Sequence, residues 1–137
     1  MTGKTFVDTN IFLYTIERAN STRRSKARRL VHDCQDSGLG VVSTQVINEF
    51  AVNAMHRFGQ SPSEVRRYFR LFEHFEIVTH SLDLAKQALE ICESAKVSYW
   101  DAILIAAASS AKCSTLYTED LSHGQSIQGL KIVNPFA

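Results

Sequence analysis

The chain has 137 residues, about the length of one domain, and its 45% hydrophobic and 21% charged residues are ordinary for a globular protein. No apolar run reaches the roughly 18 residues that a membrane-spanning helix needs, and the start of the chain lacks the apolar segment of a signal peptide. We therefore expect a cytoplasmic protein with no membrane partner.

Strand-like and helical patterns alternate from one end of the chain to the other. Strand-like runs lie at residues 5–7, 41–42, 75–78, 115–117 and 132–133. Apolar residues at helical spacing lie between them, beginning near Ile11 and including a small, apolar stretch after Ser98. Alternation of this kind predicts an α/β fold in which residues 1–137 form a single domain, with a central parallel sheet of four to five strands flanked by helices on both faces.

Start and stop signals mark the ends of the expected helices. Ser43 or Thr44 is a candidate N-cap, Gly59 a candidate C-cap, and Ser61-Pro62 opens a further helix. Three cysteines are far apart and odd in number, which predicts small core residues rather than a disulfide framework or a zinc site. They are Cys34, Cys92 and Cys113.

The net charge of +1 hides an uneven distribution. Residues 18 to 70 hold ten Lys and Arg against four Asp and Glu, whereas the rest of the chain holds five against ten. Basic runs are usually solvated helix faces. A basic half paired with an acidic half is also the distribution expected if cations hold a phosphate backbone against a metal site. The candidate nucleic-acid contacts are Arg23, Arg24, Arg28, Arg29, Arg66 and Arg67.

Four acids stand at the edges of predicted elements, namely Asp8, Glu49, Asp101 and Asp120. Ligands of parallel sheets bind beyond the carboxyl ends of the strands, where these acids can meet. Converging carboxylates repel one another, and a divalent cation relieves that repulsion. Because the set contains only oxygen ligands, it favours Mg²⁺ or Mn²⁺ over zinc.

Each acid also has a purely structural explanation. Asp8 fits an N-cap of the first helix, as Asn10 does. Glu49 points away from the apolar stripe of its helix, which fits a solvent-exposed position. Asp101 completes a capping box with Ser98, and Asp120 fits an ordinary turn.

Taken together, these segments resemble the PIN domain, a family of small metal-dependent nucleases that includes the toxins of VapBC toxin–antitoxin pairs. The resemblance rests on Asp8-Thr9-Asn10 after the first strand, on Tyr99-Trp100-Asp101-Ala102-Ile103 with the alanines that follow, and on Thr118-Glu119-Asp120. The chain departs from many relatives in Leu121-Ser122-His123-Gly124-Gln125. That departure leaves the roles of Glu119 and Asp120 open.

The resemblance implies hydrolysis of RNA phosphodiester bonds. Asp8, Asp101 and Asp120 would then hold a metal, with Glu49 binding or positioning a second one. Hydroxyl, amide and carboxylate side chains beside the acids would orient these ligands, and they are Thr9, Asn10, Ser98, Thr118 and Glu119. The family likeness further implies a homodimer that is restrained by a small antitoxin protein.

Other classes of protein fit less well. A receiver-type phosphoacceptor needs an acidic pair after the first strand and a Lys before Pro135, where this chain has Asn134. Asn10 breaks the Asp-x-Asp motif of a haloacid-type phosphatase, and Gly38-Leu39-Gly40 is too short for a dinucleotide-binding motif. A non-catalytic PIN-like domain that binds RNA or a partner remains the alternative. Among the histidines only His123 is near an acid, and we expect it to be a loop residue.

Overall fold

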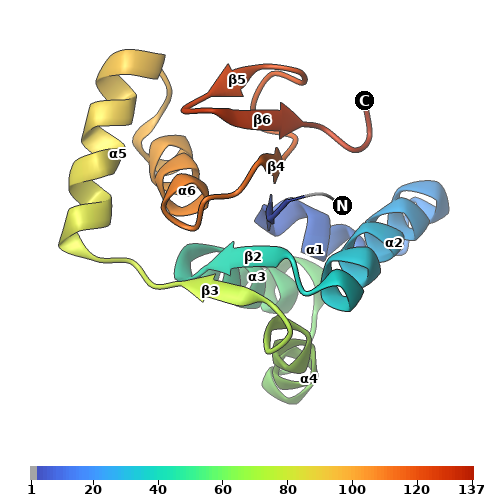
Figure 1. Cartoon of the computed structure of the whole chain (residues 1–137). Helices are drawn as coiled ribbons and strands as arrows, with labels where there is room; N and C mark the ends of the chain where they lie inside the picture. Colours follow the sequence, from blue (N-terminus) through green and yellow to red (C-terminus); the bar gives the residue numbers. More distant parts are fainter. Residues whose placement is uncertain (1–2) are drawn as a thin grey trace.

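The computed structural model describes residues 3–137, which form one six-stranded sheet between two layers of helices (Figure 1). The strands are β1 (Thr5–Val7), β2 (Gly40–Ser43), β3 (Glu76–Val78), β4 (Thr115–Tyr117), β5 (Ser126–Ile127) and β6 (Leu130–Val133). The helices are α1 (Thr9–Tyr14), α2 (Ser21–Ser37), α3 (Thr44–Phe58), α4 (Pro62–Phe72), α5 (Leu82–Ala95) and α6 (Tyr99–Ser110). The predicted α/β class is confirmed.

The strands are ordered β3-β2-β1-β4-β6-β5 across the sheet, and all neighbours are parallel except β5 and β6. The prediction of four to five strands missed β5. This strand has only two residues and pairs Ser126 with Lys131 and Ile127 with Leu130, so it is too short to show a period in the sequence. From β1 the chain continues to β2 and β3 on one side of β1, and it then crosses to β4 on the opposite side of β1. The carboxyl ends of β1 and β4 therefore border the point where strand order reverses, the usual ligand site of such sheets.

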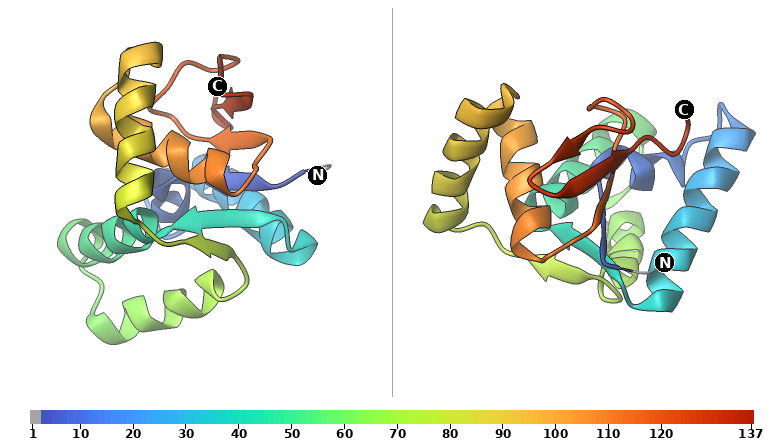
Figure 2. Two further views of the ribbon diagram at one scale, coloured as in Figure 1. Left: turned by 60° about the vertical axis from the view of Figure 1, so that its left-hand side comes forward. Right: turned by 45° about the horizontal axis from the view of Figure 1, so that its top comes forward.

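Helices cover both faces of the sheet, as predicted. Helices α5 and α6 pack on each other over one face (Figure 2). On the other face, α1 contacts both α2 and α3, and α3 contacts α4. The alanines of α6, Ala106, Ala107 and Ala108, are completely buried. Small side chains at these positions let α6 lie close to the sheet, which fixes where its first turn is placed.

The core beneath α1, α3 and α4 is rich in phenylalanine. The ring centre of Phe12 lies 4.9 Å from that of Phe72, 5.6 Å from that of Phe75 and 6.5 Å from that of Phe50, all with edge-to-face geometry, which is a favourable arrangement for aromatic pairs. A Cβ atom on Gly40 would lie 2.5 Å from the Phe75 ring. Glycine at the start of strand β2 therefore avoids a steric clash with the Phe75 ring.

The predicted helix boundaries are largely confirmed. Ser43 caps α3, Gly59 ends it in the left-handed conformation at φ 64°, and Ser61 forms a full capping box with Glu64. Helix α1 begins earlier than the apolar pattern indicated, because the side chain of Asp8 caps it.

The cysteines are placed as the sequence predicts. All three thiols are free, with Cys34 and Cys113 buried and Cys92 half-buried against the core. Within residues 3–137, none of the helices has both the length and the apolar character required to cross a bilayer.

Candidate active site

Asp8 is the buried centre of the candidate site. It follows β1 directly, and only 6% of its surface is exposed. Its Oδ1 accepts a hydrogen bond from the Thr9 amide at 2.7 Å, and its Oδ2 accepts one from the Thr118 hydroxyl at 2.8 Å. The first bond is the helix cap that the structural explanation of Asp8 required. The second joins the ends of β1 and β4, so both carboxylate oxygens are fixed in direction.

The surroundings of Asp8 disfavour its charge. The pKa of its carboxyl is raised to about 7, chiefly by burial and to a smaller extent by the carboxylates of Asp120 and Glu49, while the hydrogen bonds from Thr118 and Thr9 act in the opposite direction. Two of the other predicted acids, Asp120 and Glu49, therefore act electrostatically on Asp8. A cation close to Asp8 would restore its charged form.

Asp120 lies next to this centre. Its backbone amide donates to the Thr118 hydroxyl at 3.1 Å, so one hydroxyl group contacts both Asp8 and Asp120. Burial raises the pKa of the Asp120 carboxyl, and the carboxylates of Asp101 and Glu119 add to the rise. Asp120 is thus the electrostatic link between Asp8 and Asp101.

Glu119 points elsewhere. Its carboxylate accepts a hydrogen bond from the Tyr14 hydroxyl. Burial together with this contact raises the pKa of Tyr14 to about 12, so Tyr14 is a hydrogen-bond donor at neutral pH. The Arg23 guanidinium lies over the Tyr14 ring, 4.0 Å from its centre. This geometry favours Asp120 over Glu119 as the fourth acid of the site, and the assignment stays a prediction.

Asp101 lies in the first turn of α6, whose N-cap is Ser98. The Ser98 hydroxyl accepts a hydrogen bond from the Asp101 amide at 3.2 Å. The reciprocal bond of a capping box is present between Glu64 and the Ser61 amide, but no such bond joins the Asp101 carboxylate to Ser98 in the described part of the chain. The cap therefore uses the backbone of Asp101 and leaves its half-buried carboxylate available.

Glu49 lies on the outer face of α3, as its position in the helical pattern predicted. It is exposed, and its backbone carbonyl accepts a hydrogen bond from the Asn53 side chain at 2.8 Å. Its carboxylate is nevertheless close enough to Asp8 to raise the pKa of that group. Glu49 is therefore both a solvent-exposed residue and the outer member of the acid group.

The four carboxylates are chemically suited to bind a hard cation, although their side chains do not converge on one point. Among residues 3–137, no three His, Cys, Asp or Glu side chains lie close enough together to enclose an ion. Two observations favour a cation here. The donors are all carboxylates, and two of them, Asp8 and Asp120, have a raised pKa to which neighbouring carboxylates contribute. The Thr9 hydroxyl beside Asp8 is buried, and no described residue forms a hydrogen bond with it. Oxygen donors of this kind match Mg²⁺ or Mn²⁺.

A comparison with protein families identifies the fold. The PIN domain family model matches residues 5–124. The chain belongs to the PIN domain family. The match contains Asp8, Glu49, Asp101 and Asp120, as well as every residue named above as a neighbour of these acids.

Solved structures agree with this family at the level of the fold. A toxin–antitoxin complex from Klebsiella pneumoniae contains a chain that is 22% identical, with a TM-score of 0.72 over 96% of this chain and 98% of that one. VapC20 of Mycobacterium tuberculosis, described as a toxin that cleaves the sarcin-ricin loop, is 20% identical with a TM-score of 0.69 over 91% and 98%. VapBC2 of Rickettsia felis, solved with a DNA fragment from its promoter, contains a chain that is 16% identical. Its TM-score is 0.60 over 93% of this chain and 96% of that one. Among curated proteins, none matches the sequence significantly.

Three of the arginines predicted to contact nucleic acid are engaged within the PIN domain itself. Arg23 forms a salt bridge with Glu17. Arg24 donates to the Glu17 carbonyl at 3.1 Å, and Arg28 donates to the Thr15 carbonyl at 2.9 Å. These contacts fasten the start of α2 to the segment that follows α1, which gives the three side chains a structural role that the charge pattern did not indicate.

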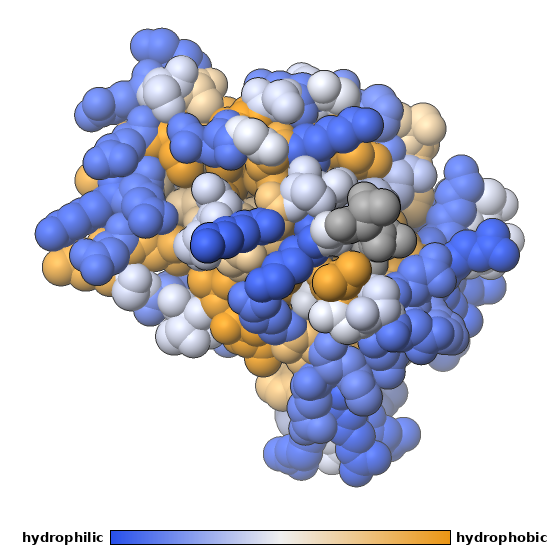
Figure 3. Space-filling view, in the orientation of Figure 1, coloured by the Kyte–Doolittle hydropathy of each residue, from blue (hydrophilic) through white to orange (hydrophobic). Residues whose placement is uncertain are grey.

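The other three arginines are differently placed. Arg29, Arg66 and Arg67 are exposed and form no hydrogen bond or salt bridge with any described residue. Helix α4, which carries Arg66 and Arg67, projects as a strongly hydrophilic part of the surface at the bottom of Figure 3. The cations that remain available to a nucleic acid are therefore fewer than the sequence indicated.

The structure also adds residues that the sequence analysis did not assign. A hollow of about 530 Å³ beside the acids is lined by Thr44, Gln45, Asn48, Glu49, His80 and Trp100. His123, the one histidine considered from the sequence, accepts a hydrogen bond from the Asn134 amide at 3.0 Å and so supports a loop. In the sequence, this hollow could have been suspected from Trp100, a large aromatic residue that directly precedes the candidate metal ligand Asp101.

Proposed function

We propose that this PIN domain is a metal-dependent endoribonuclease that hydrolyses RNA phosphodiester bonds and acts in the cytoplasm as the toxin of a VapBC-type toxin–antitoxin pair. The observation that carries the proposal is the buried carboxyl of Asp8, whose pKa is raised by burial and by the nearby carboxylates of Asp120 and Glu49, at the point where the strand order of the sheet reverses. The toxin assignment is supported by the descriptions of the similar structures, two of which are toxin–antitoxin proteins and one a toxin that cleaves the sarcin-ricin loop.

Asp8, Asp101 and Asp120 would hold Mg²⁺ or Mn²⁺, with Glu49 at the outer side of the group. When bound, such a cation lowers the pKa of a water molecule and stabilises the negative charge that develops on the phosphate. Glu49 and Asp101 make no side-chain hydrogen bond within the described residues, so their carboxylates are free to turn toward a cation. No side chain has to act as a nucleophile.

The residues around the acids would keep the ligands in position. The Thr118 hydroxyl donates to the Asp8 carboxylate and accepts from the Asp120 backbone amide, and the Thr9 amide donates to the other oxygen of Asp8. Tyr14 keeps Glu119 turned away from the group. In the hydrolysis, a water oxygen bonds to phosphorus while the bond from phosphorus to one ribose oxygen breaks, and the leaving oxygen takes up a proton.

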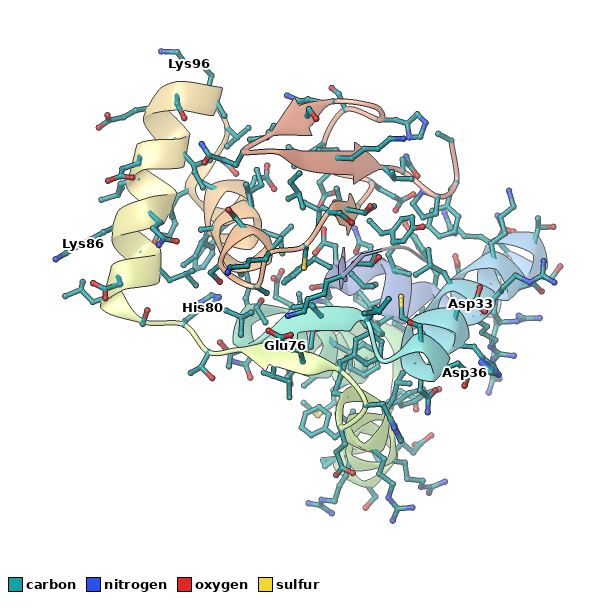
Figure 4. The ribbon with its side chains drawn as sticks, viewed as in Figure 1. Asp33, Asp36, Glu76, His80, Lys86 and Lys96 are labelled. Atoms are coloured by element: carbon teal, nitrogen blue, oxygen red, sulfur yellow. The ribbon has the colours of Figure 1, made fainter. Side chains whose placement is uncertain are left out.

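The decisive experiment is cleavage of RNA by the purified protein with Mn²⁺, in comparison with the same protein in EDTA. We expect cleavage with Mn²⁺ and none with EDTA. Asp33→Asn is a matched control for substitutions of the acids, because Asp33 is an exposed aspartate on α2 without a hydrogen bond or salt bridge among the described residues (Figure 4). Cleavage that persists in EDTA would contradict the metal requirement.

A second function has one observation in its favour. Because no three described acids enclose an ion in the present arrangement, a non-catalytic PIN domain that binds RNA or a protein partner also fits. That function predicts RNA binding with no cleavage at any concentration of Mg²⁺ or Mn²⁺, so the same assay discriminates between the two.

The partners are part of the proposal. By family likeness the protein forms a homodimer and binds a small antitoxin. Light scattering of the purified protein, alone and with the product of an adjacent small gene, tests both points. A monomer at all concentrations would contradict the homodimer without affecting the nuclease assignment.

A further inference from the structure

The hollow beside the acid group has an unusual wall. Trp100 has 65% of its surface exposed, although it is the largest apolar side chain of the protein. Its ring contacts that of Tyr99 in a T-shaped arrangement, with ring centres 5.6 Å apart, and most of the indole surface still remains exposed. Since Trp100 directly precedes Asp101 and Glu49 lines the same hollow, a group held there would lie next to the acids.

Two polar atoms in the wall have no partner. Gln45 Oε1 and His80 Nε2 are buried, yet neither forms a hydrogen bond with a described residue. His80 is held in place by its backbone, which donates to the Thr44 hydroxyl at 3.3 Å, and Figure 4 shows it on the connection between β3 and α5, below α6. Buried polar atoms without partners are costly and rare in native proteins, so a ligand that forms hydrogen bonds with these two atoms would gain free energy of binding.

The chemistry of the wall selects among possible occupants. It contains no Lys or Arg and includes the Glu49 carboxylate, so a phosphate is disfavoured. Burial lowers the pKa of His80, whose neutral ring offers one hydrogen-bond donor and one acceptor. The amides of Gln45 and Asn48 also offer both. An occupant with a flat apolar face and a polar edge fits this wall better than a purely apolar side chain.

We propose that the hollow holds one unpaired nucleobase of the RNA strand next to the cleaved bond, with its face on Trp100 and its edge read by Gln45 and His80. Stacking of bases on aromatic side chains and hydrogen bonding to their exposed edges are the means by which single-stranded RNA is recognised. The volume of about 530 Å³ lies within the range of ordinary ligand pockets. This inference rests on the proposed function, because it takes RNA as the substrate.

A direct test uses the emission of Trp100, the only tryptophan in the sequence. The protein in EDTA is titrated with a short single-stranded RNA and, separately, with an oligomer of the same length that lacks the bases. We expect saturable quenching by the RNA and little by the abasic oligomer. Equal quenching by both, or none by either, overturns the proposal. Quenching by RNA from a protein that never cleaves it would instead reject the nuclease function and leave the base site standing.

Variants then separate stacking from edge recognition. Trp100→Ala should raise the KM for single-stranded RNA on the order of tenfold with little change in kcat, the loss expected for one base stack, and Trp100→Phe should recover most of it. Gln45→Met, which removes the amide but keeps the size, should reduce the preference among bases at one position. Leu82→Ala is the control, because Leu82 is 72% exposed and is not part of the wall.

The outcomes also identify another occupant. If Trp100→Ala cleaves RNA with unchanged KM but no longer self-associates or binds the antitoxin, the hollow is a protein contact and the base site is wrong. If wild type cleaves RNA while neither Trp100→Ala nor Gln45→Met alters KM or base preference, the proposal fails and the nuclease function stands.

Discussion

In the acid group, the positions of the charges of Asp8, Asp101 and Asp120 are set by the backbone, because each of them follows a strand or lies in the first turn of a helix. Asp8 caps α1, Asp101 lies in the first turn of α6 and Asp120 is tied through its amide to Thr118. On α2, in contrast, the positions of the charges depend on long side chains, since Arg24 and Arg28 donate hydrogen bonds to carbonyl oxygens of the preceding segment. Short acids at element ends are placed by the fold, whereas the direction of an arginine depends on the acceptors it can reach.

The largest expected effect tests the acid side of this comparison. Asp8→Asn keeps the size of the side chain and an oxygen that can accept from the Thr9 amide, but it removes the charge. We expect RNA cleavage to fall by more than the roughly 10–100-fold that is typical for residues that only orient metal ligands. The measurement is the single-turnover rate with Mn²⁺, with Asp33→Asn as control. An active Asp8→Asn enzyme would remove Asp8 from the metal site.

The next effect distinguishes two neighbouring acids. Asp120→Asn should reduce cleavage strongly, because Asp120 lies between Asp8 and Asp101 in the electrostatic network. Glu119→Gln should reduce it only mildly, since the Glu119 carboxylate is occupied by Tyr14. Rates of both variants at saturating Mn²⁺ decide the matter, and equal losses would mean that the fourth acid is assigned wrongly.

A smaller effect appears in stability and needs no RNA. The folded-state pKa of Asp8 is about 7, above its ordinary value of 3.8, so the unfolded chain loses this proton first as pH rises. Wild type in EDTA should therefore lose stability between about pH 4 and pH 7, and Asp8→Asn should lose less. At pH 7.5, Mn²⁺ at a hundredfold excess over its Kd should add about 2.7 kcal/mol to wild type.

Thermal melts at several pH values, with EDTA and with Mn²⁺, measure this effect. Asp33→Asn should behave as wild type in both conditions. A wild-type melting temperature that Mn²⁺ does not change would argue against a metal site, and an equal rise in Asp8→Asn would place the metal elsewhere.

The smallest effects test the basic side of the comparison. Replacing Arg29, Arg66 and Arg67 by Gln should leave the melting temperature unchanged and reduce the salt dependence of RNA binding, with the slope falling by about 0.7 for each phosphate that the variant fails to neutralise. Arg24→Ala and Arg28→Ala should instead destabilise the fold by on the order of 1 kcal/mol each, because each removes a hydrogen bond to a backbone carbonyl.

Binding at several salt concentrations and chemical denaturation separate these two groups of arginines. If substitution of the three exposed arginines changes neither affinity nor salt slope, they do not contact RNA, and the cationic surface serves another purpose.

Most of the fold could be predicted from the sequence, because it depends on local signals. The stripe before Gly59, the Ser61-Pro62 start and the alanines of α6 each reflect a rule that acts over a few residues. Strand β5 escaped prediction because it is defined by its pairing with β6 and not by its own two residues.

The candidate site could be predicted only in part, for a related reason. The acids stand at element ends, so their order along the chain indicated where they would lie. The contact of Tyr14 with Glu119, 105 positions away, depends on the packing of α1 against the loop after β4. The same holds for His80, which becomes part of the hollow only because the connection from β3 passes beside α3 and α6.

The hydrogen bond between Asp8 and the Thr118 hydroxyl joins residues 110 positions apart. Strand β1 is made among the first residues of the chain, yet β4, its neighbour in the sheet, is synthesised only near the end. During translation, the Asp8 carboxylate therefore gains its hydrogen bond from Thr118 only after Thr118 has been synthesised. Asp120 also comes to lie beside it only at that stage. Because domains are completed as the chain emerges, an unfinished or truncated polypeptide that lacks β4 cannot assemble the acid group, however well its first helices have formed.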